Sequence, residues 1–121
     1  MFKLFSLFSR SSPLKSAASP AELKKRLDWG EPALTIIDIR SKEAFLEGHI
    51  TGAVPVSDAI LVESAAASLE RERDIYVYGS NDEQSTAAAD RLREAGYQSV
   101  AELKGGLPAW KAIKGSVETS W

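Results

Sequence analysis

Residues 75–96 read IYVYGSNDEQSTAAADRLREAG, and this stretch decides the fold class. Its first four residues are β-branched or aromatic, which is typical of a strand buried on both faces. Residues 85–95 place small and apolar side chains on one helical face, and Gly96 stands where a helix ends. A polar loop, residues 79–84, lies between them. The stretch therefore predicts a strand, a loop and a helix in succession.

The same alternation continues on both sides of this stretch. Ser19 and Glu22 form a capping-box pattern with Pro20 at the first helical position, so a helix begins there and ends within residues 29–32. Strands separated by helices require right-handed crossovers, so we expect an α/β fold of three layers with a parallel sheet between helices. The remaining strands are predicted at residues 34–39, 53–56 and 99–103, and the remaining helices at 41–47, 58–71 and 107–114.

Composition excludes several classes of protein. The chain has 121 residues, which is the size of one domain, and a net charge of −2, which does not fit a nucleic-acid-binding surface. It has no Cys and one His, so disulfides, thiol nucleophiles, thiolate metal sites and iron–sulfur clusters are excluded. No apolar run approaches the ~20 residues that span a bilayer. We expect no cofactor and no metal.

Charge and composition divide the chain into three parts. Residues 1–19 carry three basic residues and no acidic residue, whereas the remainder is acidic. We assign residues 1–12 to an amphipathic segment and linker, residues 13–115 to the domain, and residues 116–121 to a C-terminal tail.

The loop after the 75–78 strand is the first candidate site. In parallel sheets, ligands bind at the carboxyl ends of strands, where a loop leads into a helix. Residues 79–84 occupy such a position, and their N–H groups could curl into a nest that holds an anion.

Several segments, taken in order, resemble the rhodanese-like (rhodanese-homology) domain family between about residues 14 and 114. The resemblance implies a sheet of five parallel strands whose first, edge strand is residues 14–17. It rests on Asp38-Ile39-Arg40, residues 45–53, residues 75–78 with their loop, residues 87–103, and Gly105-Gly106 to Trp110.

The chain departs from this family at the catalytic loop. The resemblance implies that active members begin the loop with a Cys, which carries sulfur as a persulfide, and close it with Arg-Ser. Gly79 stands at the Cys position and Gln84 at the Arg position. Ser80 and Ser85 do not replace the thiolate, because a hydroxyl without an adjacent base is a poor nucleophile. We expect neither sulfur transfer nor the phosphatase chemistry of related Cys-x₅-Arg loops.

The loop is also acidic. Asp82 and Glu83 repel an anionic sulfur donor by roughly 1 kcal/mol each at a distance of about 5 Å. Two interpretations of Asn81, Asp82, Glu83 and Gln84 are open: a solvated loop tip, or an acidic docking surface for a basic partner, with Asp82 and Glu83 as contacts. A metal site there would need ligands from elsewhere.

Four other residues are interpreted as structural. Asp38 and Arg40 follow a strand and, in the family's pattern, hold loops together. His49 is expected to bond nearby backbone, since a base without a nucleophile has no catalytic use. Trp110, after the Gly105-Gly106 turn, is expected to anchor the core.

Residues 1–10 form an amphipathic pattern. Phe2, Phe5 and Phe8 recur at helical spacing, with Lys3 and Arg10 among the polar positions. Ten helical residues extend about 15 Å, which suits a membrane surface and does not cross a bilayer. An anchor to a membrane surface or large complex, a mini-helix on the domain itself, and part of an organellar transit sequence all remain open. A secretory signal is disfavoured because Ser6 interrupts a short apolar run.

Two classes of function follow. The preferred one is a catalytically inactive interaction or scaffold module, which binds a protein partner or large complex and is tethered by residues 1–10. It would act on the cytoplasmic side, with peripheral membrane contact, or after organellar import. The alternative is an anion-binding or sulfur-carrier-binding protein that works with a partner's Cys.

Overall fold

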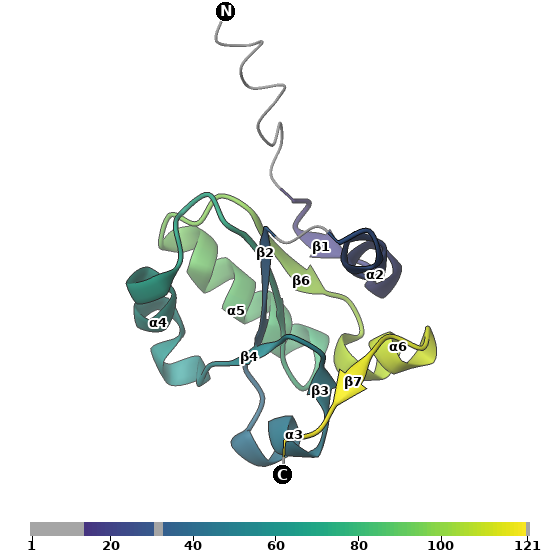
Figure 1. Cartoon of the computed structure of the whole chain (residues 1–121). Helices are drawn as coiled ribbons and strands as arrows, with labels where there is room; N and C mark the ends of the chain where they lie inside the picture. The colour runs from purple at the N-terminus through teal and green to yellow at the C-terminus, as the bar shows by residue number, and fades with distance from the viewer. Residues whose placement is uncertain (1–13, 31–32, 121) are drawn as a thin grey trace, which may run out of the picture.

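The computed structural model describes residues 14–30 and 33–120. Five strands form one parallel sheet in the order β1-β6-β5-β2-β4 (Figure 1). Its strands are β1 (Ala17–Ala18), β2 (Leu34–Asp38), β4 (Val54–Pro55), β5 (Asp74–Tyr78) and β6 (Val100–Leu103). The predicted α/β fold with a five-stranded parallel sheet is confirmed.

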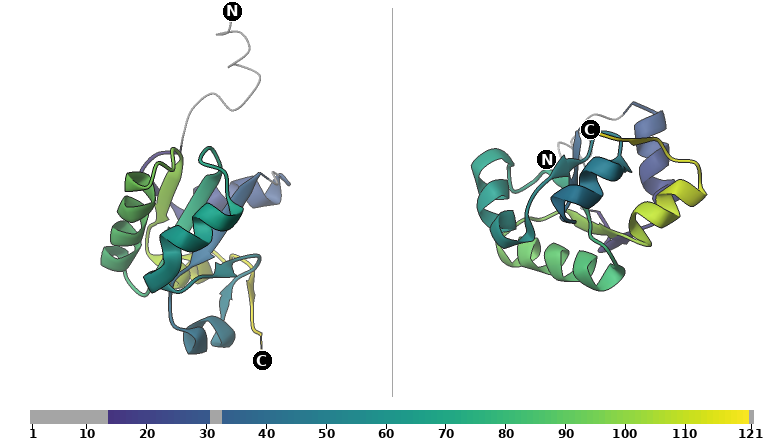
Figure 2. Two further views of the ribbon diagram at one scale, coloured as in Figure 1. Left: turned by 90° about the vertical axis from the view of Figure 1, so that its left-hand side faces the viewer. Right: turned by 90° about the horizontal axis from the view of Figure 1, so that it is seen from below.

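Helices cover both faces of this sheet. On one face lie α2 (Pro20–Asp28) and α6 (Gly106–Ala112), and on the other lie α4 (Leu61–Ser68) and α5 (Asp82–Glu94) (Figures 1 and 2). The short helix α3 (Lys42–Glu47) lies beyond the carboxyl end of the sheet, and a 3₁₀ turn, η1 (Asp58–Ile60), leads into α4. The three layers therefore follow the expected arrangement.

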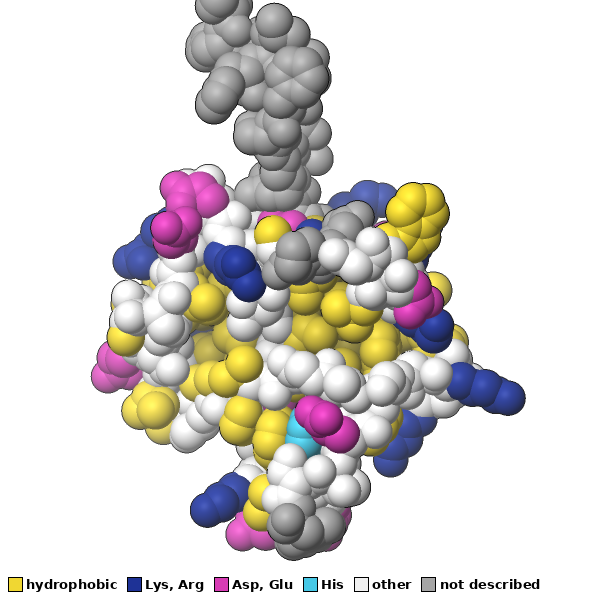
Figure 3. Space-filling model, in the orientation of Figure 1, with side chains coloured by type: hydrophobic (Ala, Val, Ile, Leu, Met, Phe, Trp, Pro, Cys, Tyr) yellow, Lys and Arg dark blue, Asp and Glu magenta, His cyan; other side chains and the backbone are white. Residues whose placement is uncertain are grey.

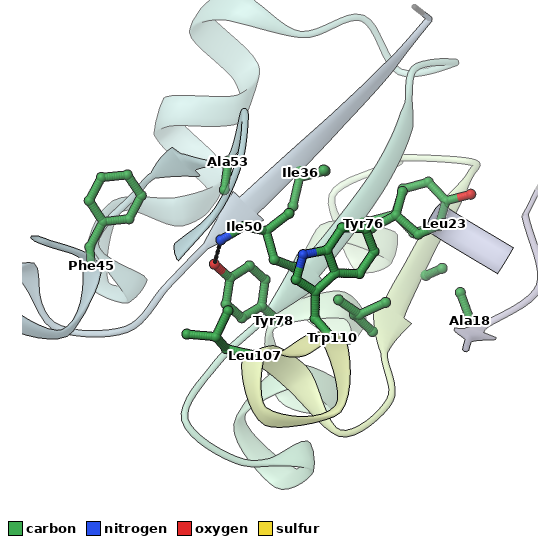
Figure 4. Packing of buried hydrophobic residues seen from close by; sticks show 12 residues of the cluster. Ala18, Leu23, Ile36, Phe45, Ile50, Ala53, Tyr76, Tyr78, Leu107 and Trp110 are labelled. Atoms are coloured by element: carbon green, nitrogen blue, oxygen red, sulfur yellow. Dashed lines mark hydrogen bonds between the residues drawn. The ribbon is translucent and has the colours of Figure 1, made fainter. Parts of the chain in front are cut away.

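The alternation of side chains along β5 explains why this strand lies at the centre. Tyr76 and Tyr78 pack toward α2 and α6, while Ile75 and Val77 pack toward α4 and α5. All four are at most 2 % exposed, as a strand covered on both faces requires. The side chains between the sheet and helices α2 and α6 form one hydrophobic core. Figure 4 shows Tyr76 and Tyr78 in this core, beside Trp110.

The predicted capping box at the start of α2 is present. Ser19 Oγ accepts a hydrogen bond from Glu22 N–H (3.2 Å), and Ser19 N–H donates to Glu22 Oε1 (2.7 Å). The backbone hydrogen bond from Ser19, helped by its side chain, lowers the pKa of Glu22. The cap fixes where α2 leaves β1.

Some boundaries differ from the predictions. The edge strand β1 covers Ala17–Ala18 instead of residues 14–17, and the helix predicted over 58–71 is divided into η1 and α4, which ends at Ser68. The α4 helix has no side-chain cap at its start, and its C-cap residue, Leu69, has an extended backbone (ψ 139°). Helix ends without side-chain caps leave little trace in a sequence.

A second, two-stranded sheet was not predicted. β3 (His49–Ile50) pairs antiparallel with β7 (Val117–Glu118). The segment assigned to a C-terminal tail thus contributes a strand that lies against residues next to α3 (Figure 1). Two-residue strands separated by 67 residues give no periodicity to recognise.

Candidate functional site

The loop after β5 is shorter than predicted. Asn81 caps α5: its Oδ1 accepts a hydrogen bond from Gln84 N–H (2.8 Å), and the helix begins at Asp82 instead of residue 85. Asn followed by Asp and Glu is a recognisable helix start, because the cap accepts an N–H and the acids suit the helix dipole. The sequence therefore contained the signal for the earlier start.

Gly79 and Gln84 fit each other across this loop. A Cβ atom at position 79 would lie 2.9 Å from Gln84 Cβ, 3.0 Å from Gln84 Oε1 and 3.3 Å from Ile39 Cδ1. Ordinary side chains do not approach that closely, so a side chain at position 79 requires the Gln84 side chain or the start of α5 to move. Gly79 and Gln84, the two residues that depart from the family pattern, are therefore packed against each other.

Four N–H groups of residues 79–85 donate to acceptors within the same stretch. Gly79 N–H donates to Ser85 Oγ (2.9 Å), and Ser80 N–H donates to Gln84 Oε1 (2.9 Å). Gln84 N–H bonds Asn81 Oδ1, and Ser85 N–H bonds Asn81 O (3.1 Å). The amide oxygen of Gln84 thus accepts the N–H of Ser80, one of the groups of the predicted anion nest, and for the N–H groups of residues 81–83 the nest stays a prediction.

The two acidic residues of the loop have different surroundings. Asp82 Oδ1 accepts a hydrogen bond from Gly105 N–H (2.9 Å), which ties the start of α5 to the turn before α6. Glu83 is exposed in the first turn of α5. Of the two predicted partner contacts, Asp82 has a structural bond and Glu83 faces solvent.

Asp38 and Arg40 form a buried ion pair beside the loop. Arg40 Nη2 lies 2.6 Å from Asp38 Oδ2, Arg40 Nη2 also donates to Gly48 O (2.7 Å), and the guanidinium lies 5.4 Å from the centre of the Tyr78 ring. Burial lowers the pKa of Arg40, but the hydrogen bonds and charge of Asp38 outweigh it, so the pKa is raised. This pair joins the end of β2 to the turn after α3.

A hollow of about 320 Å³ opens beside the loop. Arg40 and Lys111 supply its positive charges, and Gly79 and Ser80 form its loop side. Its other lining residues are Ala44, Leu107 and Pro108. Lys111 was not predicted as a site residue, because α6 approaches the loop only through the tertiary fold.

His49 directly follows the turn after α3 and is 2% exposed. Its ring stacks on Phe45 (3.7 Å between centroids), and its Nδ1–H donates to Phe45 O (2.7 Å). Its Nε2 lies 3.3 Å from Glu118 Oε1 on β7. These contacts agree with a structural interpretation and add a partner, Glu118, that lies 69 residues away in the sequence.

Trp110 is 1 % exposed, and its Nε1–H donates to Ser116 O (2.8 Å). A Cβ atom at Gly115 would overlap the Trp110 ring, so the chain after α6 lies flat against the indole. Trp110 thereby holds the segment that forms β7.

Some predictions concern residues outside the described part of the chain. Phe2, Phe5 and Phe8, with the rest of residues 1–10, lie outside the residues that the structure describes. Within residues 14–30 and 33–120, no group of three or more His, Asp or Glu side chains could hold a metal ion. Of the helices in the same ranges, none has the length and apolar character needed to cross a membrane.

Comparison with known proteins agrees with the fold. A thiosulfate sulfurtransferase, GlpE of Coxiella burnetii, is 33% identical over 91 residues, which cover 75% of this chain and 79% of that protein. An HTH-type transcriptional regulator of Mycobacterium tuberculosis, Rv0324, is 33% identical over 99 residues, covering 80% of this chain and 42% of the regulator. The crystal structure of Alr3790 from Anabaena sp. superposes with a TM-score of 0.83 at 51% identity, covering 85% of this chain and 92% of that one.

The family described as "Rhodanese-like domain" matches residues 19–113, which include every strand of the parallel sheet except β1. The chain belongs to the rhodanese-like domain family.

Proposed function

We propose that this chain is a rhodanese-like module that binds a protein partner and does not carry sulfur on its own residues. The observation that supports this most is the contact between Gly79 and Gln84, which fills the place of the nucleophile with an amide side chain. Sulfur transfer through the protein needs a thiolate, and the chain contains no Cys. The scaffold is retained, while the loop is closed on itself.

A thiosulfate:cyanide assay tests the catalytic half of this proposal. The purified full chain is expected to give no turnover above buffer, because no residue can form a persulfide. GlpE of Coxiella burnetii, whose name states thiosulfate sulfurtransferase activity, serves as the positive control. Turnover that survives treatment of the sample with a thiol-blocking reagent would contradict the proposal, since it would show a route without a thiolate.

Residues 1–10 supply the proposed attachment. Leaving a phenylalanine ring in water forgoes roughly 1.5–3 kcal/mol of burial, and this segment contains three. Lys3 and Arg10 suit an anionic surface, such as lipid headgroups or an acidic protein face. We therefore assign the segment to a membrane surface or a large complex on the cytoplasmic side, with organellar import as the alternative.

Fractionation tests the attachment. The full chain is expected to sediment with membranes or a large assembly, and the triple variant Phe2→Ser/Phe5→Ser/Phe8→Ser is expected to stay in the supernatant. Trp29→Ser, which removes an aromatic ring that is 77% exposed outside the segment, provides the matched control. Equal sedimentation of the full chain and the triple variant would refute an anchoring role for the three rings.

The hollow beside the loop favours a second candidate function. Lys111 lies beside a space of about 320 Å³ next to Ser80, which Arg40, paired with Asp38, also lines. Such a space suits an anionic group presented by a partner, including a persulfide on the partner's Cys. Binding of a persulfidated peptide that disappears in Lys111→Gln would support this candidate, and binding unaffected by that substitution would exclude it.

A further inference from the structure

An apolar cavity lies between α4 and the edge of the sheet, on the face opposite α2 and α6. It has a volume of about 160 Å³. Hydroxyl side chains of β2 and α4 complete its walls, of which the apolar members are Ile37, Val54, Val56, Leu61, Ala65 and Leu69. None of these residues belongs to the loop after β5 or to the hollow beside it.

Two features of the fold create this space. The α4 helix reads LVESAAAS, so small side chains face the sheet along most of its length. The edge strand β4 is two residues long, and it pairs only with the last two residues of β2. Val54, in β4, is consequently 47% exposed. Figure 3, which faces this side, shows hydrophobic side chains at the surface between α4 and the centre of the molecule.

The volume of the cavity indicates what it can hold. An engineered protein cavity of about 150 Å³ with apolar walls binds benzene. The cavity under α4 has nearly the same volume, about 160 Å³. It therefore has room for one phenyl ring, and its hydroxyl groups lie at part of the wall only.

We propose that a phenylalanine ring from residues 1–10 of the same chain occupies this cavity. The three rings of that segment, Phe2, Phe5 and Phe8, are the phenylalanines of the chain other than Phe45. Phe45 is 8% exposed and lies in the opposite core. The occupant is thus a side chain of matching size that the chain itself provides.

The connection to the sheet places the segment within reach. Leu14 N–H donates to Ser99 Oγ (2.8 Å), and Ser99 Oγ donates to Asp74 Oδ1 (2.7 Å). Asp74 is the register partner of Leu34, which precedes the cavity residue Thr35. Leu14 packs against the core on the α2 and α6 face. The segment must therefore pass over the end of the sheet, a distance of at least about two strand spacings, or roughly 10 Å, to reach the cavity end of β2.

The length of the segment is more than sufficient. Extended chain from Leu14 spans up to about 20 Å to Phe8 and about 40 Å to Phe2, so each of the three rings can reach over the end of the sheet. A tethered group has an effective concentration in the millimolar range, on the order of that for a short flexible linker, so a weak contact is populated.

The docking of the ring does not depend on the proposed attachment, but the functional consequence of docking rests on it. A ring held under α4 is not available to a membrane or a complex, so attachment requires its release. The cavity and the attachment surface then compete for the same ring, so docking in the cavity weakens the binding of the segment to a membrane or complex.

Fluorine NMR on the full chain labelled with 4-fluorophenylalanine tests this directly. The label gives four resonances, assigned by single Phe→Leu substitutions, and Phe45 reports that the domain is folded. We expect one resonance of the segment to be shifted from the free amino acid and, like that of Phe45, insensitive to exchange of H₂O for D₂O. Three resonances at the solvent-exposed position would overturn the proposal.

Substitutions in the cavity walls test whether the ring binds in this cavity. Ser64→Leu fills the cavity from a half-buried position, and it is expected to return the shifted resonance to the exposed position. Ala87→Leu adds a larger side chain on the exposed side of α5 and is the matched control, with no expected change. Val54→Ser, at the surface wall, is expected to weaken the shift without unfolding the domain. A shifted resonance that Ser64→Leu and Val54→Ser both leave unchanged would refute docking at this cavity.

Dilution distinguishes the chain's own segment from that of a second copy. A shift that is constant over a hundredfold range of protein concentration supports the intramolecular contact, and its loss on dilution would refute it. Sedimentation with membranes in the absence of any buried resonance would overturn this inference while leaving the proposed attachment intact.

Discussion

Replacing Gly79 by Cys is expected to destabilise the domain by about 2–4 kcal/mol without creating an active enzyme. The new Cβ would lie 2.9 Å from Gln84 Cβ, so the start of α5 or the Gln84 side chain must move. Overpacking of this kind costs about 1–3 kcal/mol. Displacing Gln84 also removes the acceptor of Ser80 N–H, which contributes roughly 0.5–1.5 kcal/mol.

Urea unfolding under reducing conditions measures this cost. Gly79→Ala introduces the Cβ without the thiol, so it should lower the midpoint nearly as much as Gly79→Cys. Gln84→Gly removes both close contacts, and a double-mutant cycle with Gly79→Cys should give a coupling of more than about 1 kcal/mol. An unchanged midpoint in Gly79→Cys, or a coupling near zero, would refute the interlocked contact.

The same variants distinguish an effect on the stability of the domain from an effect on sulfurtransferase activity. Gly79→Cys alone is expected to stay at background in the thiosulfate:cyanide assay, because the loop still lacks the charge of an Arg at position 84. Activity comparable to that of the sulfurtransferase GlpE in this single variant would show that the loop adapts freely and that the electrostatic argument is wrong.

Three further predictions follow from buried groups. Trp110→Ala should lower the free energy of unfolding by about 3–5 kcal/mol, measured by urea denaturation, and an unchanged midpoint would contradict the burial of the ring. Arg40→Ala should cost about 3–5 kcal/mol because it leaves the Asp38 carboxylate buried, and Asp38→Asn in the same background should recover part of the loss; a lack of recovery would argue against the ion pair as the cause. Burial raises the pKa of Tyr78, so the folded state favours the neutral phenol: its stabilising contribution is full below about pH 10, the usual pKa, and is lost as the pH rises toward the folded value. Tyr78→Phe should therefore be less sensitive to alkaline pH than the unsubstituted chain, in melting curves between pH 9 and 11, even though Ile50 N–H loses its acceptor.

The sequence predicted what depends on local pattern. The run at residues 75–78 and the capping box at Ser19 determine their structures through near neighbours, and both were predicted correctly. The start of α5 was predicted three residues late, because Asn81 was interpreted as part of a loop although it is a good cap. That error was avoidable.

Other features depend on residues that are distant in the sequence. Lys111 reaches the loop after β5 only because α6 packs beside β5, and Glu118 reaches His49 only because Trp110 holds the chain after α6. The fit between Gly79 and Gln84 is local in sequence, but it depends on a side-chain rotamer. The loss of the nucleophile could be seen in the sequence, whereas the closed loop could not.

The contact between Gly79 and Gln84 also has an evolutionary consequence. A lineage that holds both residues cannot regain a side chain at position 79 by a neutral single step, because that step meets Gln84 at 2.9 Å. Changing Gln84 first instead removes the acceptor of Ser80 N–H. Either single substitution at this pair passes through a less stable intermediate, so the pair behaves as an epistatic ratchet that hinders the return of a side chain to position 79.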